Sequence, residues 1–487
     1  AEPIPVSHTM EEPNDYYYYL QHHLPQIQAE EAWDIHKGEN GTEETIIGIM
    51  DTGVDWDHED LRENMWQNLG EDADGDGTVL EYNGSEWTFD PDDENGLDDD
   101  GNGYADDFIG WDFYNENNDP DPVGWEDHGS HCAGLAAART NNETGVAGVS
   151  WNLKIMAMED YTFEDAYQGI IYAAENGADV ISNSWGHYYF YSANLDAMQY
   201  AQGLGSIIVA AASNDDVYRC LYPASYPQVV CVASVAEDDT KASYSNYGPN
   251  VTISAPGGDG GTDGNLFSTV INNYDWKMGT SMASPVAAGV FALVKSYHPD
   301  WLPMEVMAQV IGTADTIDCL NPDYVNQLGS GRVNAYRALT ETGASLPADL
   351  KMDLFNFAVE DLDGDGIRSP GDTLLLSVTL QNFSFGLFDP EATFTLGSDD
   401  PQVMVESLVQ TDSIPPNNYF ELNEPFQVIL SEEATPHFAE FYLAATSQLP
   451  IAYGDTTRFE LFVAPDGIMV FQGPESGNAY SGQYIKG

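Results

Sequence analysis

Short runs of apolar residues alternate with helical patterns from residue 45 to about residue 342. Three runs, at 45–51, 178–186 and 205–214, are apolar almost throughout, which is typical of strands buried on both faces of a parallel sheet. Two stretches rich in small residues, 128–138 and 279–297, predict helices that pack closely on such a sheet. The pattern therefore predicts an α/β domain over residues 1–342.

The pattern changes at three places along the chain. Residues 1–20 form a polar arm, and residues 68–107 form an acidic, glycine-rich insertion without apolar periodicity. After a polar link at 340–349, residues 350–465 alternate apolar and polar positions with turn residues between the runs, which predicts an all-β sandwich. Residues 466–487 begin a further segment or tail.

Composition narrows the possible partners. The 487 residues include 14 basic and 81 acidic side chains, for a net charge of −67. Such a surface repels nucleic acid and anionic lipid, so we expect neither as a partner. It suits cations and a protein that stays soluble in salty water, so we expect salt tolerance. No apolar run has the length of a membrane span or resembles a signal peptide. Cys220 and Cys231 could form a local disulfide or remain two buried thiols.

Residues that could carry chemistry lie at strand ends and helix starts. In open α/β sheets the active site lies beyond the carboxyl ends of the strands, where Asp51 and Asn214 follow apolar runs. His128 begins one predicted helix, and Ser281 lies at the start of another, with Pro285 expected in its first turn. A serine nucleophile needs an imidazole to take its proton and a carboxylate to orient that imidazole.

Three sequence blocks resemble the signature blocks of the subtilisin-like serine proteases, or subtilases. They are "GIMDTGVDWDHEDL", "HGSHCAG" and "GTSMASP", and the likeness runs through residues 20–342 with a further match in "VAAASND". The resemblance implies a three-layer, parallel-sheet catalytic domain and a secreted endopeptidase whose propeptide has been removed. By position, Asp51 would orient the imidazole, His128 would be the general base, Ser281 the nucleophile and Asn214 an oxyanion donor.

His131 and Cys132 lie one helical turn from His128. This spacing is also compatible with a metal site or with a thiol nucleophile. A metal site would need a further ligand, and no other histidine or cysteine lies near these residues in sequence. A reactive thiol must be exposed and activated. We therefore expect a packed, hydrogen-bonded His131 and a buried Cys132.

Two strand ends resemble the segments that line the family's main specificity pocket. We expect an open, apolar cleft that prefers large uncharged side chains. The expected substrate-binding residues are Ser184, Trp185, Gly186, Ala211, Ala212 and Ser213.

Structural calcium is the expected cofactor. Calcium takes six to eight oxygen ligands, which acidic loops supply at alternate positions before a glycine. Three loops have this form: Asp72, Asp74 and Asp76; Asp98, Asp100 and Asn102, with Asp106 as a possible closing ligand; and Asp361, Asp363 and Asp365, closed by Asp372. By resemblance, Asp60 and Asn142 match side-chain ligands of a calcium site common in subtilases.

Two other functions compete with a secreted endopeptidase acting on proteins or peptides. One is a catalytically silent binding protein on the same scaffold, against which the complete set of three catalytic residues argues. The other is a peptide ligase or macrocyclase, which the sequence leaves open because ligation and hydrolysis share the acyl-enzyme.

Overall fold

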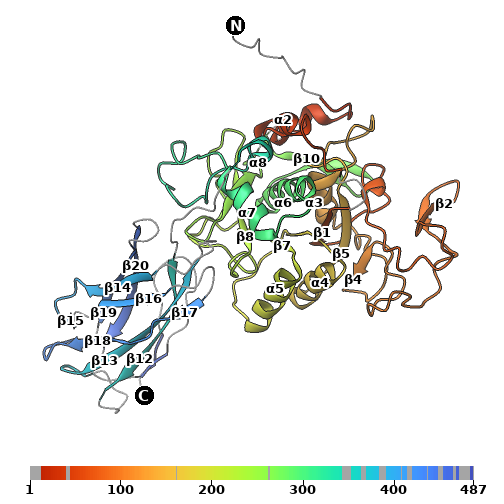
Figure 1. Cartoon of the computed structure of the whole chain (residues 1–487). Helices are drawn as coiled ribbons and strands as arrows, with labels where there is room; N and C mark the ends of the chain where they lie inside the picture. Colours follow the sequence, from red (N-terminus) through yellow and green to blue (C-terminus); the bar gives the residue numbers. More distant parts are fainter. Residues whose placement is uncertain are drawn as a thin grey trace, which may run out of the picture. The chain divides into compact units, whose positions relative to one another are not determined.

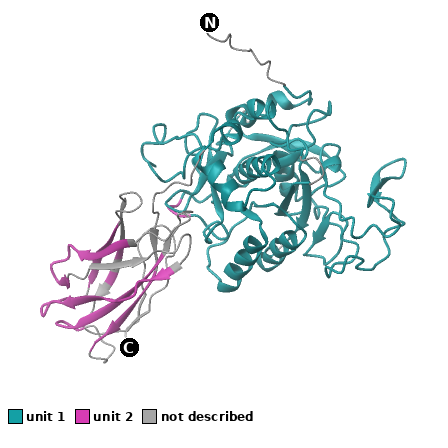
Figure 2. Cartoon of the chain, in the orientation of Figure 1, with its two compact units in different colours: residues 1–216, 220–345 teal, residues 217–219, 346–487 magenta. Residues whose placement is uncertain are grey.

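The computed structural model describes residues 12–39, 44–160, 162–260, 264–342, 352–362, 369–382, 391–406, 409–413, 419–435, 437–447, 453–463, 468–470 and 483–485. The chain divides into two compact units (Figure 2). Unit 1 comprises residues 1–216 and 220–345, and unit 2 comprises residues 217–219 and 346–487.

A seven-stranded parallel sheet lies at the centre of unit 1. The prediction of an α/β domain around a parallel sheet is confirmed, because the strands are buried almost throughout and run in the same direction. The order is β4 (Gly110–Asp112), β5 (Lys154–Glu159), β1 (Ile46–Asp51), β6 (Val180–Asn183), β7 (Ile207–Ala211), β8 (Val230–Val235) and β9 (Ile253–Pro256).

Helices cover both faces of this sheet, which gives three layers (Figure 1). The helices α3 (His128–Ala137) and α6 (Thr280–Tyr297) lie on one face, and α4 (Phe163–Glu175) and α5 (Ser192–Leu204) lie on the other. All residues of α3 after His128 are buried, since glycine and alanine let the helix approach the sheet closely. The shorter elements are η1 (Tyr18–Leu20), α1 (His23–Gln26), α2 (Ala29–Trp33), η2 (Arg62–Asn64), α7 (Pro303–Gly312) and α8 (Ala335–Thr340).

Two antiparallel hairpins complete unit 1. The first, β2 (Leu80–Tyr82) with β3 (Trp87–Phe89), belongs to the acidic insertion, and it lies at the outer edge of the unit (Figure 1). The second, β10 (Leu266–Val270) with β11 (Asn273–Lys277), precedes α6. Cys220 and Cys231 form a disulfide, which settles the choice that the sequence left open.

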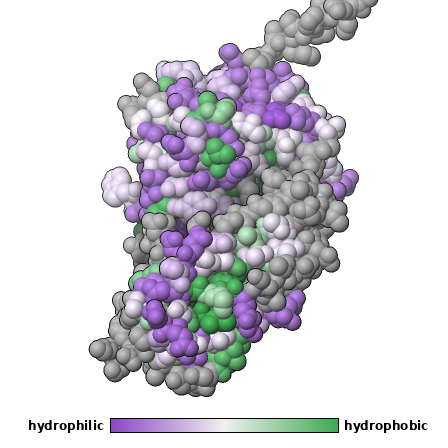
Figure 3. Space-filling view, turned by 90° about the vertical axis from the view of Figure 1, so that its left-hand side faces the viewer, coloured by the Kyte–Doolittle hydropathy of each residue, from purple (hydrophilic) through white to green (hydrophobic). Residues whose placement is uncertain are grey.

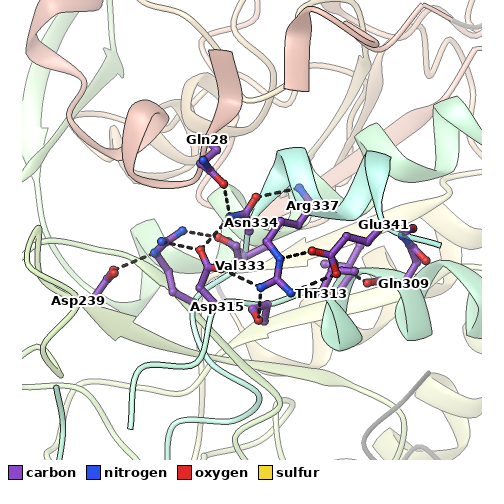
Figure 4. A network of polar contacts seen from close by, with 12 residues as sticks. Gln28, Asp239, Gln309, Thr313, Asp315, Val333, Asn334, Arg337 and Glu341 are labelled. Atoms are coloured by element: carbon purple, nitrogen blue, oxygen red, sulfur yellow. Dashed lines mark hydrogen bonds and ion pairs between the residues drawn. The ribbon is translucent and has the colours of Figure 1, made fainter. Parts of the chain in front are cut away.

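A polar network links the first helices of unit 1 to its last helix (Figure 4). At its centre, the guanidinium of Arg332 donates to Asp239 and to Asp315, each at 2.8 Å. The amide of Asn334 donates to Gln28 at 2.6 Å and to Asp315 at 2.8 Å. Arginine–carboxylate bonds thus connect segments that are far apart in the sequence.

The described residues of unit 2 form two larger antiparallel sheets and one small one. Side chains from both larger sheets, such as Val378, Phe394 and Phe441, belong to one buried core. The strands are β12 (Met352–Asp361), β13 (Thr373–Asn382), β15 (Val403–Val405), β17 (Tyr419–Glu421) and β18 (Phe426–Leu430) in the first sheet; β14 (Glu391–Ser398), β16 (Val409–Ser413), β19 (His437–Ser447) and β20 (Tyr453–Val463) in the second; and β21 (Ile468–Val470) with β22 (Gln483–Ile485).

The surface carries many hydrophilic side chains. On the face shown in Figure 3, hydrophilic residues cover much of the described area, and groups of hydrophobic residues lie between them. Among the described residues, no helix is both long enough and apolar enough to cross a membrane.

Candidate active site

The imidazole of His128 is held by a carboxylate at the end of the central strand. Asp51 is the last residue of β1 and is 4% exposed. Its Oδ1 lies 2.7 Å from Nδ1 of His128, which begins α3. Burial opposes the charged imidazole, but the adjacent Asp51 carboxylate raises the pKa of His128 well above its ordinary value. Because Nδ1 is occupied, Nε2 is the nitrogen left to exchange protons with a substrate or nucleophile.

The two neighbours of His128 in the opening helical turn lie where the sequence predicted. His131 is fully buried, and its Nε2 lies 3.2 Å from the carbonyl oxygens of Leu266 and Asp275. Burial lowers the pKa of His131 to about 3, so this histidine stays neutral. Cys132 is also buried, and burial raises its pKa, which keeps the sulfur in the unreactive thiol form. The predictions of a packed histidine and a buried thiol are confirmed.

Ser281 is the second residue of α6 and lies beside Cys132. Its hydroxyl donates to the carbonyl of Ser184 at 3.0 Å. The Cys132 sulfur is 4.0 Å from Nδ1 of His128 and 3.4 Å from the carbonyl of Ser281, so the thiol contacts both residues. To give its proton to the imidazole, this hydroxyl has to leave the Ser184 carbonyl. Hydrogen bonds between catalytic groups are often loose until substrate binds.

The prediction that Pro285 lies in the first helical turn is wrong. The helix begins at Thr280, so Pro285 lies in its second turn, inside the helix. Proline has no N–H to donate to the carbonyl four residues earlier, which is that of Ser281. That carbonyl instead accepts bonds from the Ser184 hydroxyl, at 2.8 Å, and from the Cys132 thiol. Because the helical bond is missing, the Ser281 carbonyl can hold the residue to Ser184, which follows β6, and to Cys132 in α3.

Asn214 faces the start of α6 with its amide orientation fixed. Its Oδ1 accepts bonds from the N–H and the hydroxyl of Thr280, both at 2.9 Å, so Nδ2 must point elsewhere. A Cβ placed on Gly279 would lie 3.6 Å from both Asn214 Nδ2 and the backbone nitrogen of Ser281. Both donor nitrogens thus lie close to the space that the absent side chain of Gly279 leaves. Its φ of 149° also disfavours other residues.

Three of the six expected substrate-binding residues follow β6, and the other three lie at or just after the end of β7, but they differ in exposure. Ser184 contacts Ser281, and the backbone N–H of Ser213 donates to the hydroxyl of Thr280 at 3.2 Å. Trp185 is half-buried and packs against His187 and Phe163. Gly186 lies beside Leu221 and Tyr222, whereas Ala211 and Ala212 are buried.

Asp60 and Asn142 are brought together, as the resemblance implied. Asn142 donates its amide to Asp60 Oδ1 at 2.8 Å, and the N–H of Val146 donates to Oδ2 at 2.7 Å. Asp60 is fully buried, which raises its pKa to about 7. Asp15, in the N-terminal segment, accepts bonds from the N–H groups of residues 141 and 142. Two carboxylates at one place suit a calcium ion, which would supply the missing positive charge. The Oδ1 of Asn142 accepts the N–H of Thr144 at 2.8 Å, so its amide would have to turn to act as a ligand.

The two acidic loops of the insertion have the same local structure. In one, the N–H groups of Gly75 and Gly77 donate to Asp72; in the other, those of Gly101 and Gly103 donate to Asp98. All four glycines have positive φ, between 78° and 100°. Carboxylate oxygens of Asp72, Asp74 and Asp76 lie within 4.8 Å of one another, which suits a divalent cation.

The second loop gathers carboxylates that the sequence pattern did not indicate. Oxygens of Glu71, Asp100 and Asp107 also lie within 4.8 Å of one another. Asp107 is fully buried, and this burial raises its pKa to about 7. Asp106, the residue expected to close this loop, instead accepts N–H bonds from Asn95 and Gly96. Glu71 could not be found from loop spacing, because it precedes the loop by almost thirty positions.

The third predicted loop belongs to unit 2, and only part of it lies within the described residues. Asp363 and Asp365 lie outside the described residues. Asp361 ends β12, and Asp372 accepts a hydrogen bond from the N–H of Ser369. The calcium hypothesis for this loop therefore stays a prediction.

Comparison with known proteins identifies the family. The subtilase family profile matches residues 42–344. The chain belongs to the subtilase family. It is a subtilisin-like serine protease, a hydrolase, and its parallel-sheet unit has the α/β fold of that family.

Individual relatives include a thermophilic serine proteinase and a halolysin-like protease. The chain is 35% identical over 348 residues to the thermophilic serine proteinase of Bacillus sp. (strain AK1), covering 70% of this chain and 72% of that protein. It is 35% identical to thermitase of Thermoactinomyces vulgaris, covering 67% and 99%. The same identity holds for the halolysin-like extracellular serine protease Nep of Natrialba magadii, of which the chain spans 55%. Among solved structures, a protease from Pseudoalteromonas arctica is 29% identical with a TM-score of 0.51, covering 68% of this chain and 99% of that one.

Proposed function

We propose that this subtilase is a secreted serine endopeptidase in which Asp51, His128 and Ser281 form the catalytic triad. The observation that carries the proposal is the 2.7 Å contact between Asp51 and His128 Nδ1, with the Cys132 thiol joining this imidazole to the backbone carbonyl of Ser281. With Nδ1 held, Nε2 takes the proton of the Ser281 hydroxyl as its oxygen attacks the peptide carbonyl. The imidazolium then gives this proton to the leaving amine, and water releases the acyl group.

The oxyanion formed during the attack needs donors that are already in place. Asn214 Nδ2 and the backbone nitrogen of Ser281 both lie 3.6 Å from the position that a Cβ on Gly279 would take, so they are close enough together to serve one oxyanion. Thr280 holds the Asn214 amide by its oxygen, so the amide needs no reorganisation when charge develops. The first N–H groups of a helix have no partner within the helix, which leaves the N–H of Ser281 available.

Substrates would be polypeptides with a large uncharged side chain before the cleaved bond. Ser184, Trp185, Gly186, Ala211, Ala212 and Ser213 would line that subsite, although buried Ala211 and Ala212 could contribute only small surfaces. Calcium would bind at Asp60, Asn142 and Asp15 and at the two loops of the insertion, where it would stabilise the fold rather than take part in the chemistry. A propeptide removed during maturation and a β-sandwich domain over residues 350–465 complete the proposal.

Replacing the nucleophile tests this function. Ser281→Ala should lower casein cleavage by on the order of 10⁶-fold, a factor already known from subtilisin itself, while the melting temperature stays near that of the wild type. Ser192→Ala, an exposed serine at the start of α5, is the matched control and should retain full activity. Substantial cleavage by a folded Ser281→Ala protein would exclude Ser281 as the nucleophile. Mapping the cleavage sites in casein tests the side-chain preference.

A further inference from the structure

An open cavity of about 390 Å³ lies where the β2–β3 hairpin meets the segment that follows β1. This volume lies in the range of small-ligand sites. The lining includes two kinds of side chain: the aromatic rings of Trp56, Trp87 and Phe89, and the carboxylates of Glu81, Glu94 and Asp119. The hairpin belongs to the acidic insertion and is labelled β2 in Figure 1.

Packing fixes the aromatic part of this cavity. Trp56 is 8% exposed, and its ring lies parallel to that of Phe89, with centroids 4.9 Å apart and 13° between the planes. The indole N–H of Trp56 donates to Asp119 Oδ1 at 3.2 Å. Phe89 packs in turn against Phe108, a fully buried residue. These contacts hold the aromatic wall in place before any ligand arrives.

The charge around the cavity is negative. Its lining contains three carboxylates and no basic side chain. Burial, together with the nearby carboxylates of Asp112 and Asp57, raises the pKa of Asp119, as expected where acidic groups lack a compensating cation. Arg62 is the nearby basic residue, with its guanidinium 5.8 Å from the centroid of Trp87. That contact offsets part of the negative charge, and it also shows that this ring accepts a guanidinium.

The lining favours an organic cation over a metal ion. Glu81, Glu94 and Asp119 are not among the described carboxylates whose oxygens converge closely enough to share a metal. A guanidinium is planar and weakly hydrated, so it can stack on an aromatic ring while its N–H groups reach separate carboxylates. A neutral sugar could also stack on the rings, but it would leave the negative charge uncompensated.

The cavity is close to the proposed catalytic residues along the chain. Trp56 follows Asp51 by five residues, so their Cα atoms are at most about 18 Å apart. The loop that carries Asp119 is bonded to the intervening segment: the N–H of Val54 donates to Pro120 at 2.9 Å, and the hydroxyl of Thr52 donates to Glu126 at 3.2 Å. A polypeptide bound at Asp51 and His128 would need on the order of five extended residues to reach the cavity.

We propose that this cavity is an accessory substrate site, which binds an arginine side chain of the polypeptide at a distance from the cleaved bond. The arginine guanidinium stacks on the aromatic wall and pairs with Glu94 and its neighbouring carboxylates. This inference rests on the proposed endopeptidase function and adds a second element of specificity to it. The apolar cleft selects the residue at the bond, and the insertion selects arginine-bearing chains.

Binding to the Ser281→Ala protein, which cannot consume the probe, tests the proposal directly. The probes are two fluorescent peptides that differ only in arginine or citrulline, which has the same shape without the charge. The arginine peptide should bind about tenfold more tightly. Adding Glu94→Gln should reduce this preference to less than threefold, whereas adding Glu237→Gln, a change at an exposed acid elsewhere, should not. Equal affinity for both peptides, or a preference that Glu94→Gln leaves intact, overturns the proposal, as does tighter binding of a neutral oligosaccharide.

Activity assays separate this inference from the proposed function. The active enzyme should cleave a short peptide that cannot reach the cavity, and it should have a lower KM for a longer peptide with one arginine than for its citrulline counterpart. Failure to cleave the short peptide contradicts the proposed function. Cleavage of the short peptide with equal KM values for the longer pair, wherever the arginine is placed, contradicts only the accessory site.

Discussion

Two groups of acidic residues in unit 1 meet opposite electrostatic conditions. Asp315 lies in the network of Figure 4, where burial alone would raise its pKa. Bonds from Asn334 and Arg337, with the charge of Arg332, hold that pKa below its ordinary value. Asp60 is buried without a basic partner among the described residues, and burial raises its pKa to about 7. Asp107 in the insertion has the same raised pKa for the same reason.

The contrast shows how the chain distributes its few cations. With 14 basic and 81 acidic residues, it can neutralise carboxylates internally at only a few places. Arginines are used where the first and last segments of unit 1 meet. At Asp60 and in the insertion, the compensating charge has to come from solution. We therefore expect the two groups to respond differently to chelation, mutation, pH and salt.

Removal of calcium should have the largest effect. A site loaded a hundredfold above its dissociation constant adds about 2.7 kcal/mol to the free energy of unfolding, and several sites add more. Chelation should therefore lower the melting temperature of the Ser281→Ala protein by many degrees, and calcium but not magnesium should restore it. Identical melting curves with and without chelator, at fixed ionic strength, would contradict a structural role for calcium.

Loss of the central arginine should come next. Arg332→Met removes one ion-pair partner each from Asp239 and Asp315, although Asp315 keeps its pair with Arg337. Losing a hydrogen bond to a charged group typically costs about 1.5–3 kcal/mol in the free energy of unfolding. Urea unfolding with calcium present measures this cost. Lys37→Met, at a half-buried lysine on another part of the surface, is the control. Calcium should not rescue Arg332→Met, and a rescue would mean that the two groups are not independent.

The pH dependence should reverse with calcium. Without calcium, folded Asp60 has a pKa of about 7 against about 3.9 when unfolded, so the folded state binds more protons between these values. Stability should then fall as pH rises from about 4 to 7, by at most roughly 1.4 kcal/mol per pH unit. With calcium bound to the carboxylate, stability should instead fall as pH drops. Asp60→Asn should weaken both trends, which urea unfolding at several pH values can measure.

Monovalent salt should have the smallest effect. Salt screens exposed charges over about 10 Å at 0.1 M, and a net charge of −67 makes the folded state repel itself. The melting temperature should rise as sodium chloride increases at fixed calcium, in wild type and Arg332→Met alike. A falling curve would show that screening of the arginine pairs outweighs relief of the general repulsion.

The sequence predicted the parallel-sheet unit and most of the local features of the site. Apolar runs followed by Asp51 and Asn214 indicated strand ends, and small residues after His128 indicated a closely packed helix. These features depend on neighbouring residues, which is why they are visible in a sequence. The start of α6 was predicted less accurately. Pro285 locally favours the first turn of a helix, but the bonds from Thr280 to Asn214 extend the helix backwards.

Features that depend on distant segments could not be predicted. Glu71 and Asp107 join Asp100 only because the insertion folds back on itself. Asp15 reaches the Asp60 site from a segment that looked like a polar arm. The cavity beside Trp56 likewise needs three separate segments to meet.

The bond between Gln28 and Asn334 joins residues 306 positions apart, and it has a consequence for folding rate. Together with a parallel sheet whose strands pair out of sequence order, it means that many native contacts close very long loops. Such topologies fold slowly, because the entropy of closing each loop is lost before the contacts compensate for it. The same late contacts must break together before the chain opens, so unfolding should be slow as well. For a protein that can digest its own unfolded copies, lifetime would then depend on the height of this barrier more than on equilibrium stability.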